Sequence, residues 1–367
     1  MIVSKINVVL LFGGRSSEHS ISCATAAGVM GSIDRSKYNL IPVGITRDGH
    51  YVPVADDSQR WALKAGVNLP EVVFEGASVI WPANARGELL AVAADGTSSS
   101  LGRIDVVFPV LHGPFGEDGT LQGFLELLGV PYVGNGVFAS AAGMDKEFAK
   151  ALFLAADIPV TPHAVVRAFE WANDPESVLE RVHNLGSLPL FVKPARGGSS
   201  LGVSKVTEWE DFADAMAYAL EHDNKAVIEA GVVGREVECA VLSGRGGGET
   251  RVSIAGEIKV KGRDFYDFEA KYRDEDSVDL IIPAEMEPAT LSQMQALAKM
   301  AFSAIGGRGL ARVDFFLTET GFILNEVNTM PGFTPLSMFP SLWQESGIGY
   351  PQLIDELIEL ALEPGQR

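Results

Sequence analysis

The alternation of hydrophobic and polar positions along the chain predicts an α/β protein. Residues 6–12 form an apolar run interrupted only by Asn7, as in a strand that is buried on both faces of a parallel sheet. A glycine-rich loop follows at 13–20, and then an alanine-rich helical pattern at 23–30. A strand, a glycine loop and a helix in this order open an α/β unit. Further elements are expected as strands at 40–45 and 105–110 and as a helix from Leu121.

The chain is expected to form several domains, because 367 residues are too many for one ordinary hydrophobic core. The middle of the chain predicts a helix and two strands, at 146–156, 189–193 and 202–206. The last part predicts an antiparallel sheet that ends in an amphipathic helix near 351–362. Two segments are weaker: 58–102 is expected to be irregular, and glycine-rich 244–248 is expected to be a hairpin turn.

Residues 312–328, RVDFFLTETGFILNEVN, predict a β-hairpin with the three-residue loop Glu319-Thr320-Gly321. In this register Asp314 lies opposite Glu326, and Arg312 lies opposite Asn328. The face with these four residues is expected to continue as an apolar floor of Phe316, Phe322 and Leu324. The opposite face is expected to hold Val313, Phe315, Ile323 and Val327.

Two opposed carboxylates repel each other, so the register of this hairpin indicates a bound cation. A divalent metal that prefers oxygen ligands would neutralise Asp314 and Glu326, with Asn328 as a neutral ligand and Arg312 as a fixed positive charge. Beside an apolar floor, such a site suits a magnesium nucleotide. The alternative is an ordinary surface salt-bridge cluster. A loop one residue longer would part the carboxylates, so the prediction depends on the register.

Composition narrows the class of protein. With 47% hydrophobic and 21% charged residues, the chain is typical of a soluble globular protein. A net charge of −19 argues against a nucleic-acid partner. Cys23 and Cys239 fit no metal or disulfide spacing, which favours a reducing compartment. No apolar run approaches the roughly 20 residues of a membrane span, and Gly13 ends the first run without a cleavage signal. We expect a cytoplasmic protein.

The segment 191–206, FVKPARGGSSLGVSKV, is a candidate phosphate-binding loop between two strands. Glycine lets backbone N–H groups approach a polyphosphate closely, and Lys193 could reach the same phosphates from the strand end. The alternative is a mobile hairpin tip. The Walker A pattern of P-loop proteins is absent from the sequence.

Several other polar loops each allow two interpretations. Glu18 in GGRSSEHS is either a helix cap or a group that binds a substrate ammonium, and the segment lacks the third glycine of a dinucleotide fingerprint. Residues 264–275 are either a solvated loop or a lid that carries Lys271 and Tyr272. Two histidines in glycine loops after strands, His19 and His112, rank below the carboxylates.

The segment after the hairpin, NTMPGFTPLSMFP, offers two further candidates. Pro331-Gly332 predicts a turn that could aim the Gly332 N–H at a developing oxyanion. Ser337 precedes a predicted helix and would by default be its N-cap.

Seven ordered segments resemble the D-alanine–D-alanine ligase family of the ATP-grasp superfamily. They are LFGGRSSEHSIS, HGPFGEDGTLQG, GMDKEFAK, FVKPARGGSSLGVSKV, residues 229–236, FYDFEAKY, and RVDFF with NEVNTMPGFTPLSMFP. The resemblance covers nearly the whole chain and is least clear at 58–102 and 244–248. It implies the ATP-grasp architecture, α/β overall and α+β in the ATP-binding part, with ATP between the second and third domains. The expected domains are an N-terminal doubly wound parallel-sheet domain at 1–135, a central domain at 136–225 and a C-terminal domain at 226–367.

The resemblance also assigns roles to single residues. The expected ATP-binding residues are Lys146, Lys193, Glu229, Val232, Glu236 and Lys271. Two Mg²⁺ ions, with Mn²⁺ as a substitute, would be held by Asp314, Glu326 and Asn328. Arg312 and the Gly332 N–H match oxyanion stabilisers, and Glu18, Ser199 and Tyr272 match a hydrogen-bonded triad. Glu18 would hold the ammonium of the first substrate, and Ser337 and Met338 the carboxylate of the second. One departure is Ala230-Gly231, where some relatives have a lysine and an aromatic residue against adenine.

The implied reaction is the ATP-dependent joining of two D-alanines for peptidoglycan precursor synthesis, through an acyl phosphate and a tetrahedral intermediate. The FYDFEAKY segment favours D-alanine over D-lactate as second substrate. The expected partners are D-alanine, ATP and a second copy of the chain in a homodimer, with no nucleic acid and no membrane. Two alternatives remain open: a different carboxylate–amine ligase of the superfamily, and a nucleotide-binding scaffold without catalysis.

Overall fold

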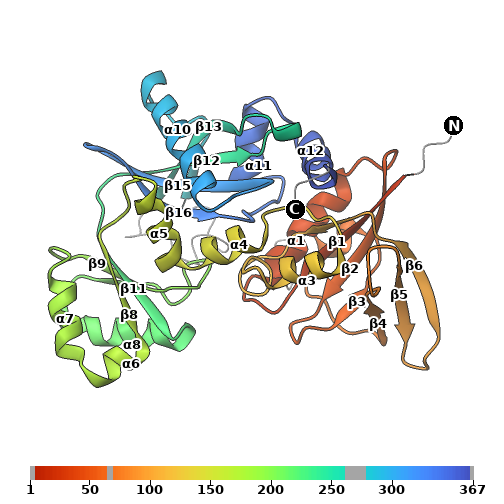
Figure 1. Cartoon of the computed structure of the whole chain (residues 1–367), viewed down its shortest axis with the longest axis horizontal. Coiled ribbons are helices and arrows are strands. Elements are labelled where there is room, and N and C mark those ends of the chain that lie inside the picture. Colours follow the sequence, from red (N-terminus) through yellow and green to blue (C-terminus); the bar gives the residue numbers. More distant parts are fainter. Residues whose placement is uncertain (1–4, 64–68, 261–277, 364–367) are drawn as a thin grey trace.

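The computed structural model describes residues 5–63, 69–260 and 278–363 (Figure 1). Within these residues the strands form four sheets. The N-terminal part, in red and orange, lies at one end of the molecule, and the segment 163–230, in yellow-green and green, lies at the other (Figure 1). The C-terminal part, in blue, lies between them (Figure 1). None of the described helices is both long enough and apolar enough to cross a membrane.

The first sheet is mainly parallel, as its apolar runs predict. Its strand order is β3 (Tyr51–Pro53), β2 (Tyr38–Ile45), β1 (Ile6–Gly13) and β7 (Val106–Pro109). Strand β1 runs parallel to both β2 and β7, and β3 is an antiparallel edge. The chain moves from β1 to one side and later returns to its other side. The loops after β1 and β7 therefore meet at one edge of the sheet, where ligands bind in open α/β sheets.

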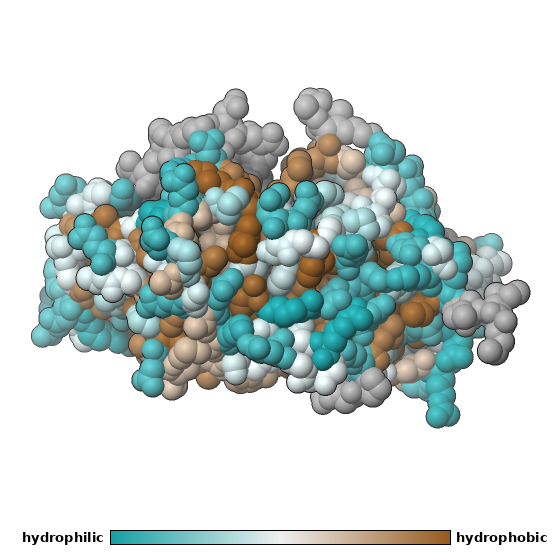
Figure 2. Space-filling model, turned by 90° about the horizontal axis from the view of Figure 1, so that it is seen from above, coloured by the Kyte–Doolittle hydropathy of each residue, from teal (hydrophilic) through white to brown (hydrophobic). Residues whose placement is uncertain are grey.

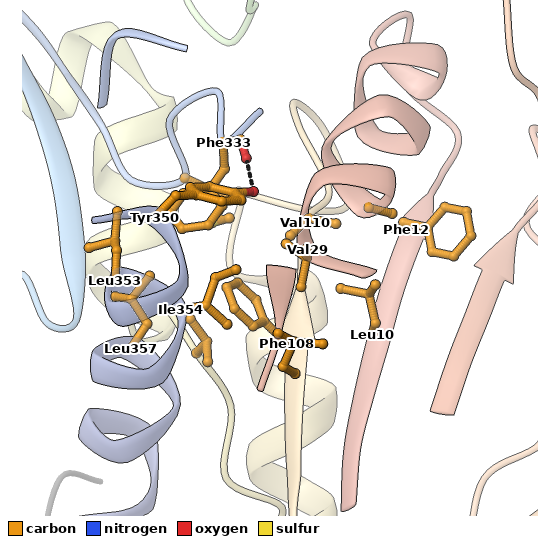
Figure 3. Packing of buried hydrophobic residues seen from close by; sticks show 14 of the residues in the cluster. Leu10, Phe12, Val29, Phe108, Val110, Phe333, Tyr350, Leu353, Ile354 and Leu357 are labelled. Carbon is orange, nitrogen blue, oxygen red and sulfur yellow. Dashed lines mark hydrogen bonds between the residues drawn. The ribbon is translucent and has the colours of Figure 1, made fainter. Parts of the chain in front are cut away.

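Helices cover both faces of this sheet, as expected for a doubly wound domain. One face packs against α1 (His19–Ser32) and α12 (Tyr350–Leu362), and the other against α3 (Thr120–Leu128). Figure 3 shows Phe108 of the sheet between Ile354 of α12 on one side and Val29 of α1 and Leu10 of β1 on the other. The amphipathic C-terminal helix is thus confirmed. Its apolar stripe completes the core of the N-terminal sheet, far away in sequence.

The expectation that 58–102 is irregular is wrong. This region contains the short helix α2 (Ser58–Trp61) and most of a three-stranded antiparallel sheet of β4 (Ala77–Ile80), β5 (Glu88–Ala93) and β6 (Ser98–Arg103). Its strands have a weak pattern because most of their side chains are exposed or half-buried. Leu89 is one of the few that pack into the core, so the sequence shows little alternation there.

The central sheet is antiparallel and presents one face to the candidate site. Its order is β10 (Ser204–Val206), β9 (Leu190–Pro194), β11 (Lys225–Ala230) and β8 (His163–Arg167). One face packs against α7 (Pro175–His183) and α8 (Phe212–His222), next to α6 (Ala168–Asn173) and the 3₁₀ turn η1 (Trp209–Asp211). The strands predicted at 189–193 and 202–206 are confirmed, and β11 continues this sheet beyond residue 225.

The C-terminal sheet carries the predicted hairpin. Its order is β14 (Val278–Ile281), β13 (Arg251–Val260), β12 (Arg235–Leu242), β15 (Leu310–Thr318) and β16 (Gly321–Asn328), all antiparallel. The turn at 244–248 is confirmed as η2 (Arg245–Gly247) between β12 and β13. One face packs against α4 (Val137–Met144), α5 (Lys146–Ala155) and α10 (Pro288–Ala304). On the other face, α11 (Met338–Glu345) covers only the part near Ala240 and Ile258.

At the end of the hairpin that carries Arg312 and Asn328, the register is as predicted. The loop that produces this register, however, differs from the predicted one. Asp314 pairs with Glu326, and Arg312 pairs with Asn328. The loop has two residues rather than three, because Thr318 pairs with Gly321. An extra residue, Asn325, then bulges from β16 and restores the expected pairing. The short loop and the bulge each shift the register by one residue, and the two shifts cancel.

Between the turn and the bulge, however, the prediction of which side chains share a face of the sheet is wrong. Phe322 and Leu324 are buried in the core with Val313, Phe315 and Val327, on the side of α10. Ile323 pairs with Phe316 instead, and both are half-buried. A one-residue shift moves every side chain to the opposite face of a strand, which explains the exchange. The apolar floor of the site is therefore made by Phe316 and Ile323.

Candidate active site

Three rows of side chains cross one face of the C-terminal sheet and make up its chemistry. Each row joins residues that pair across β12, β15 and β16. The rows are Ala240–Arg312–Asn328, Glu238–Asp314–Glu326 and Glu236–Phe316–Ile323. Charge is concentrated in the second row, and the apolar side chains lie in the third. A magnesium nucleotide needs this separation of a polar end from an apolar end.

The acidic row is held together by one guanidinium group. Arg312 donates Nε to Asp314 Oδ1 at 2.8 Å and Nη2 to Asp314 Oδ2 at 2.7 Å, a bidentate pair. Its Nε also lies 2.8 Å from Glu238 Oε2. Asn328 donates its amide to Asp314 Oδ2 at 2.8 Å. Two carboxylates therefore share one guanidinium, and Glu326 adds a third carboxylate, which leaves this row with an excess of negative charge.

The acidic row has the donors that a magnesium ion needs, but not a complete set. Among the described residues, no group of three or more His, Cys, Asp or Glu side chains is arranged to hold a metal alone. Asp314, Glu326 and the side-chain oxygen of Asn328 nevertheless supply hard oxygen ligands. Mg²⁺ usually binds through one or two carboxylates and takes further ligands from phosphates and water. The residues present therefore fit a metal that arrives with a nucleotide.

Lysines gather beside the acidic row, on α5 and β9. Lys193 donates Nζ to Glu229 Oε2 at 2.8 Å, and Lys150 lies 3.0 Å from Glu229 Oε1. Lys146 donates to the carbonyl of Gly197 at 3.0 Å and lies 3.9 Å from Glu326 Oε2. This cluster of three lysines and one glutamate has an excess of positive charge, which suits the phosphates of a nucleotide.

Glu229 is ionised by its lysines although it is buried. Burial by itself would raise the pKa of this carboxyl group, but Lys193 and Lys150 outweigh it and lower the pKa to about 2. Burial lowers the pKa of Lys150, and the charge of Glu229 opposes that effect. A buried charge of this kind persists only when it is paired. The triad Lys150–Glu229–Lys193 is therefore an internal unit of the site.

Lys150 is a site residue that was not predicted from the sequence. Its side chain is only 1% exposed, and its Nζ lies 3.5 Å from the carbonyl of Asn325, the bulged residue of β16. Lys150 thus touches both Glu229 and the bulge that sets the hairpin register. Its spacing of four residues from Lys146 was an available signal, since such residues share one helix face. Glu238 was also missed, although it alternates with Glu236 on β12.

Glu18 joins the N-terminal loop to the glycine-rich loop of the central part. The hydroxyl of Ser199 donates a hydrogen bond to Glu18 Oε1. Ser199 has φ +51°, a left-handed conformation that is uncommon outside glycine and that orients this side chain. A Cβ atom added at Gly113 or Gly198 would lie 2.8 Å from Glu18 Oε2. Both glycine loops therefore approach this carboxylate closely. Glu18 occupies the N-cap position of α1, but its side chain makes no cap hydrogen bond.

The loop before α11 places the remaining candidates. The Ser337 hydroxyl accepts a hydrogen bond from the Thr334 N–H at 3.1 Å and lies 2.8 Å from the Thr334 hydroxyl. It makes no cap hydrogen bond to α11. The Met338 side chain is buried in the core, so its backbone N–H at the first helical position is the group that can face a ligand.

Two predicted site residues, Lys271 and Tyr272, and the rest of the lid segment 264–275 lie outside the described residues. Val232 lies in the short connection between β11 and β12, next to the half-buried Ala230 and Gly231. Glu236 lies in the apolar row, opposite Phe316. The structure therefore brings together the phosphate, nucleoside and metal candidates that it describes.

Comparison with known proteins agrees with this geometry. The family model for the D-ala D-ala ligase C-terminus matches residues 152–359, and the model for the N-terminus matches residues 7–135. The chain belongs to the D-alanine–D-alanine ligase family. It is 52% identical to the D-alanine–D-alanine ligase of Arthrobacter sp. (strain FB24), with 98% of this chain and 94% of that protein covered. The corresponding enzyme of Mycobacterium avium (strain 104) is 48% identical, with 98% of each chain covered.

Solved structures of the family share the fold. The VanG D-Ala:D-Ser ligase from Enterococcus faecalis has a TM-score of 0.81 at 33% identity, covering 98% of this chain and 100% of that one. The D-alanine–D-alanine ligase from Coxiella burnetii has a TM-score of 0.80 at 31% identity, covering 98% and 94%. The expected α/β fold of the ATP-grasp superfamily is confirmed. Members of the ligase family are ATP-dependent and typically use a divalent metal, as the two charge clusters suggest.

Proposed function

We propose that this chain joins two D-alanine molecules into D-alanyl-D-alanine, with ATP converted to ADP and phosphate. The dipeptide is a building block of peptidoglycan precursors. One observation carries the proposal for this chain's own residues: an acidic row and a lysine cluster lie side by side, linked by the 3.9 Å approach of Lys146 to Glu326. Negative and positive excess charge are thus adjacent where a magnesium nucleotide would present a metal and phosphates.

ATP binds between the central and C-terminal sheets. The purine lies toward Phe316 and Ile323, with Glu236 and the backbone near Val232 at the nucleoside end. The phosphates lie toward Lys146 and Lys193, and Lys271 completes their set. Because Glu229 is held by two lysines, its position is fixed before the nucleotide arrives.

Asp314 and Glu326 of the acidic row, with Asn328 of the neighbouring row, would hold two Mg²⁺ ions, and Mn²⁺ would be able to replace them. When bound, these ions neutralise charge on the phosphoryl group that is transferred. The pairing of Asp314 with Glu326 across the strands supports this assignment.

The first D-alanine binds with its ammonium group against Glu18. Its carboxylate oxygen attacks the γ-phosphorus of ATP, the bond from that phosphorus to the bridging oxygen breaks, and ADP leaves. The product is D-alanyl phosphate. The Ser199–Glu18 hydrogen bond holds the glycine-rich loop against the bound amino acid, which keeps water from the acyl phosphate.

The second D-alanine binds with its carboxylate toward Ser337 and the Met338 N–H. Its amine, after losing a proton, attacks the acyl carbon, and the chain of Tyr272, Ser199 and Glu18 orients that step. Arg312 and the Gly332 N–H stabilise the oxyanion of the tetrahedral intermediate until phosphate leaves. Asp314 uses two N–H groups of the guanidinium, so other donors of Arg312 remain for the oxyanion.

The domain bounds, the oligomeric state and the cellular location are inferred from the same family resemblance. We divide the chain into domains at 1–135, 136–225 and 226–367, and infer a homodimer that works in the cytoplasm without nucleic acid or membrane partners. Cys23 and Cys239 are both buried free thiols, which supports a reducing compartment. Light scattering at several protein concentrations tests the dimer.

The proposal is tested by phosphate release from ATP and Mg²⁺, with products identified by mass. D-alanine alone should give one phosphate for each D-alanyl-D-alanine, and L-alanine should give neither. D-alanine mixed with D-serine or D-lactate should still give mainly D-alanyl-D-alanine. Turnover only with another acid and amine would retain the ATP chemistry but reject the substrate. Nucleotide binding without turnover would favour a scaffold.

A further inference from the structure

The loop from Thr329 to Phe333 is anchored from outside on both sides of Gly332. Asn135 donates its amide to the Thr329 carbonyl at 2.8 Å. On the other side, the Tyr350 hydroxyl donates to the Phe333 carbonyl at 2.7 Å, as Figure 3 shows. Between these anchors, both backbone polar groups of Met330 bind side chains of the N-terminal HGPFGEDG loop. The loop that carries the proposed oxyanion donor is therefore held by residues distant in sequence.

Glu117 supplies the first contact to Met330. Its Oε1 accepts the Met330 N–H at 3.0 Å, and its Oε2 accepts the Gly113 N–H at 2.6 Å. One carboxylate thus binds one backbone N–H from each of two loops. Burial raises the pKa of this carboxyl group to about 8, yet both of its oxygens accept a backbone N–H, whereas the amide of glutamine has one acceptor and one donor group. Only an acidic side chain of this length satisfies both contacts.

His112 supplies the second contact. Its Nδ1 lies 3.1 Å from the Met330 carbonyl, and its Nε2 lies 3.3 Å from the Thr25 hydroxyl. A carbonyl only accepts, so Nδ1 carries the proton and Nε2 can accept from Thr25. The backbone of His112 is fixed in turn, because the Ser16 hydroxyl donates to its carbonyl at 2.6 Å. The imidazole is buried and holds the Met330 carbonyl in one direction.

Few torsions separate this held carbonyl from the Gly332 N–H. The Met330–Pro331 peptide is planar, and the ring of Pro331 fixes its φ angle. Only the ψ angle of Pro331 remains soft between the two groups. Fixing the direction of the Met330 carbonyl therefore leaves one soft torsion, the ψ angle of Pro331, to set the direction in which Gly332 N–H points.

We propose that Glu117 and His112 are positioning residues that aim the Gly332 N–H through their joint hold on the Met330 backbone. This rests on the proposed function, in which that N–H stabilises the oxyanion. Neither side chain needs to touch the reacting atoms. Hydrogen-bond donors of this kind act only when they are in place before charge develops, so a small misplacement lowers the rate.

The test separates the two chemical steps in a single turnover. Wild-type enzyme and Glu117→Gln are mixed with ATP, Mg²⁺ and D-alanine, and ADP and dipeptide are measured by rapid quench. Hydroxylamine traps accumulated D-alanyl phosphate as its hydroxamate. We expect ADP to form within about 2-fold of the wild-type rate and dipeptide to form about 10-fold or more slowly, with hydroxamate detected. The oxyanion develops only in the second step.

Asp118→Asn is the matched control. Asp118 lies in the same loop and also accepts two backbone N–H groups, from Phe115 at 2.8 Å and Thr120 at 3.0 Å, but neither belongs to the C-terminal part. It should leave the ratio of the two rates unchanged. Pro331→Ala provides a second test if Glu117→Gln does not fold, since it frees the φ angle of residue 331 and leaves Glu117 and His112 in place. It should also slow dipeptide formation more than ADP formation.

The outcomes distinguish a failure of the proposed function from a failure of the positioning role alone. A wild-type enzyme that makes no dipeptide would reject the proposed function itself. A wild-type enzyme that makes dipeptide, with both steps unchanged or equally slowed in Glu117→Gln, would reject the positioning role alone. When only Pro331→Ala is folded, equal effects on both steps reject that role in the same way.

Discussion

Two clusters of buried charge lie side by side in this molecule and differ in sign. The lysine cluster sets Lys146, Lys150 and Lys193 against one carboxylate, Glu229. The acidic row sets Glu238, Asp314 and Glu326 against one guanidinium, Arg312. Each cluster is only partly neutralised by its own members. The remaining charge of each is opposite to one part of a magnesium nucleotide, its phosphates or its metal.

The clusters also differ in how they are built. Glu229 and Lys150 are almost completely buried, and their pairing forms part of the fold. Glu326 is half-buried, and its carboxylate is the more accessible part of the acidic row. A group paired inside the protein contributes to stability, whereas a group that waits for a ligand contributes to binding. Substitutions in the two clusters should therefore have different consequences.

The largest effect is expected from Asp314→Asn in the acidic row. This change alters a proposed metal ligand and removes the charge of the bidentate partner of Arg312. Product formation at saturating ATP should fall by about 100-fold or more. Steady-state phosphate release measures it. Glu319→Gln, in the exposed turn of the same hairpin, is the control and should keep activity within 2-fold. Equal activities of the two variants would remove Asp314 from the metal site.

The lysine cluster should show itself in the dependence of stability on pH. The pKa of Glu229 is about 2 in the folded protein, below the ordinary value of 4.5. Its stabilising contribution is present above pH 4.5 and is lost as pH falls toward 2, by about 3 kcal/mol. Urea unfolding of the wild type and Glu229→Gln across this range measures it. The difference between their free energies of unfolding should shrink on acidification. A constant difference would mean that Glu229 is not held ionised.

A smaller effect is expected outside both clusters, at Gly198. A Cβ atom there would approach Glu18 Oε2 to 2.8 Å and displace the carboxylate. Gly198→Ala should raise the KM for D-alanine severalfold and the KM for ATP less, because Glu18 is proposed to contact the amino acid, although Gly198 lies in the candidate phosphate-binding loop. Gly123→Ala, on α3 with open space around its Cβ position, is the control. An equal rise in both KM values would contradict this separation.

The sequence was sufficient for the parts of the site that depend on local pattern. The opposition of Asp314 and Glu326 was predicted from alternation, although a short loop and a bulge at Asn325 had to cancel. Lys150 was not predicted, because its partner Glu229 lies on a distant strand. The packing of α12 on the N-terminal sheet was not predicted either. An apolar helical stripe shows that a partner exists but not which one.

The measurement that tests the two-cluster account most directly is ATP binding by calorimetry, with and without Mg²⁺. It compares wild type, Glu326→Gln and Lys193→Met under conditions without D-alanine. The account predicts that wild type binds ATP at least about 10-fold more tightly with Mg²⁺, that Glu326→Gln loses most of this gain, and that Lys193→Met binds weakly in both conditions. If Glu326→Gln keeps the wild-type gain from Mg²⁺, the acidic row is not the metal site.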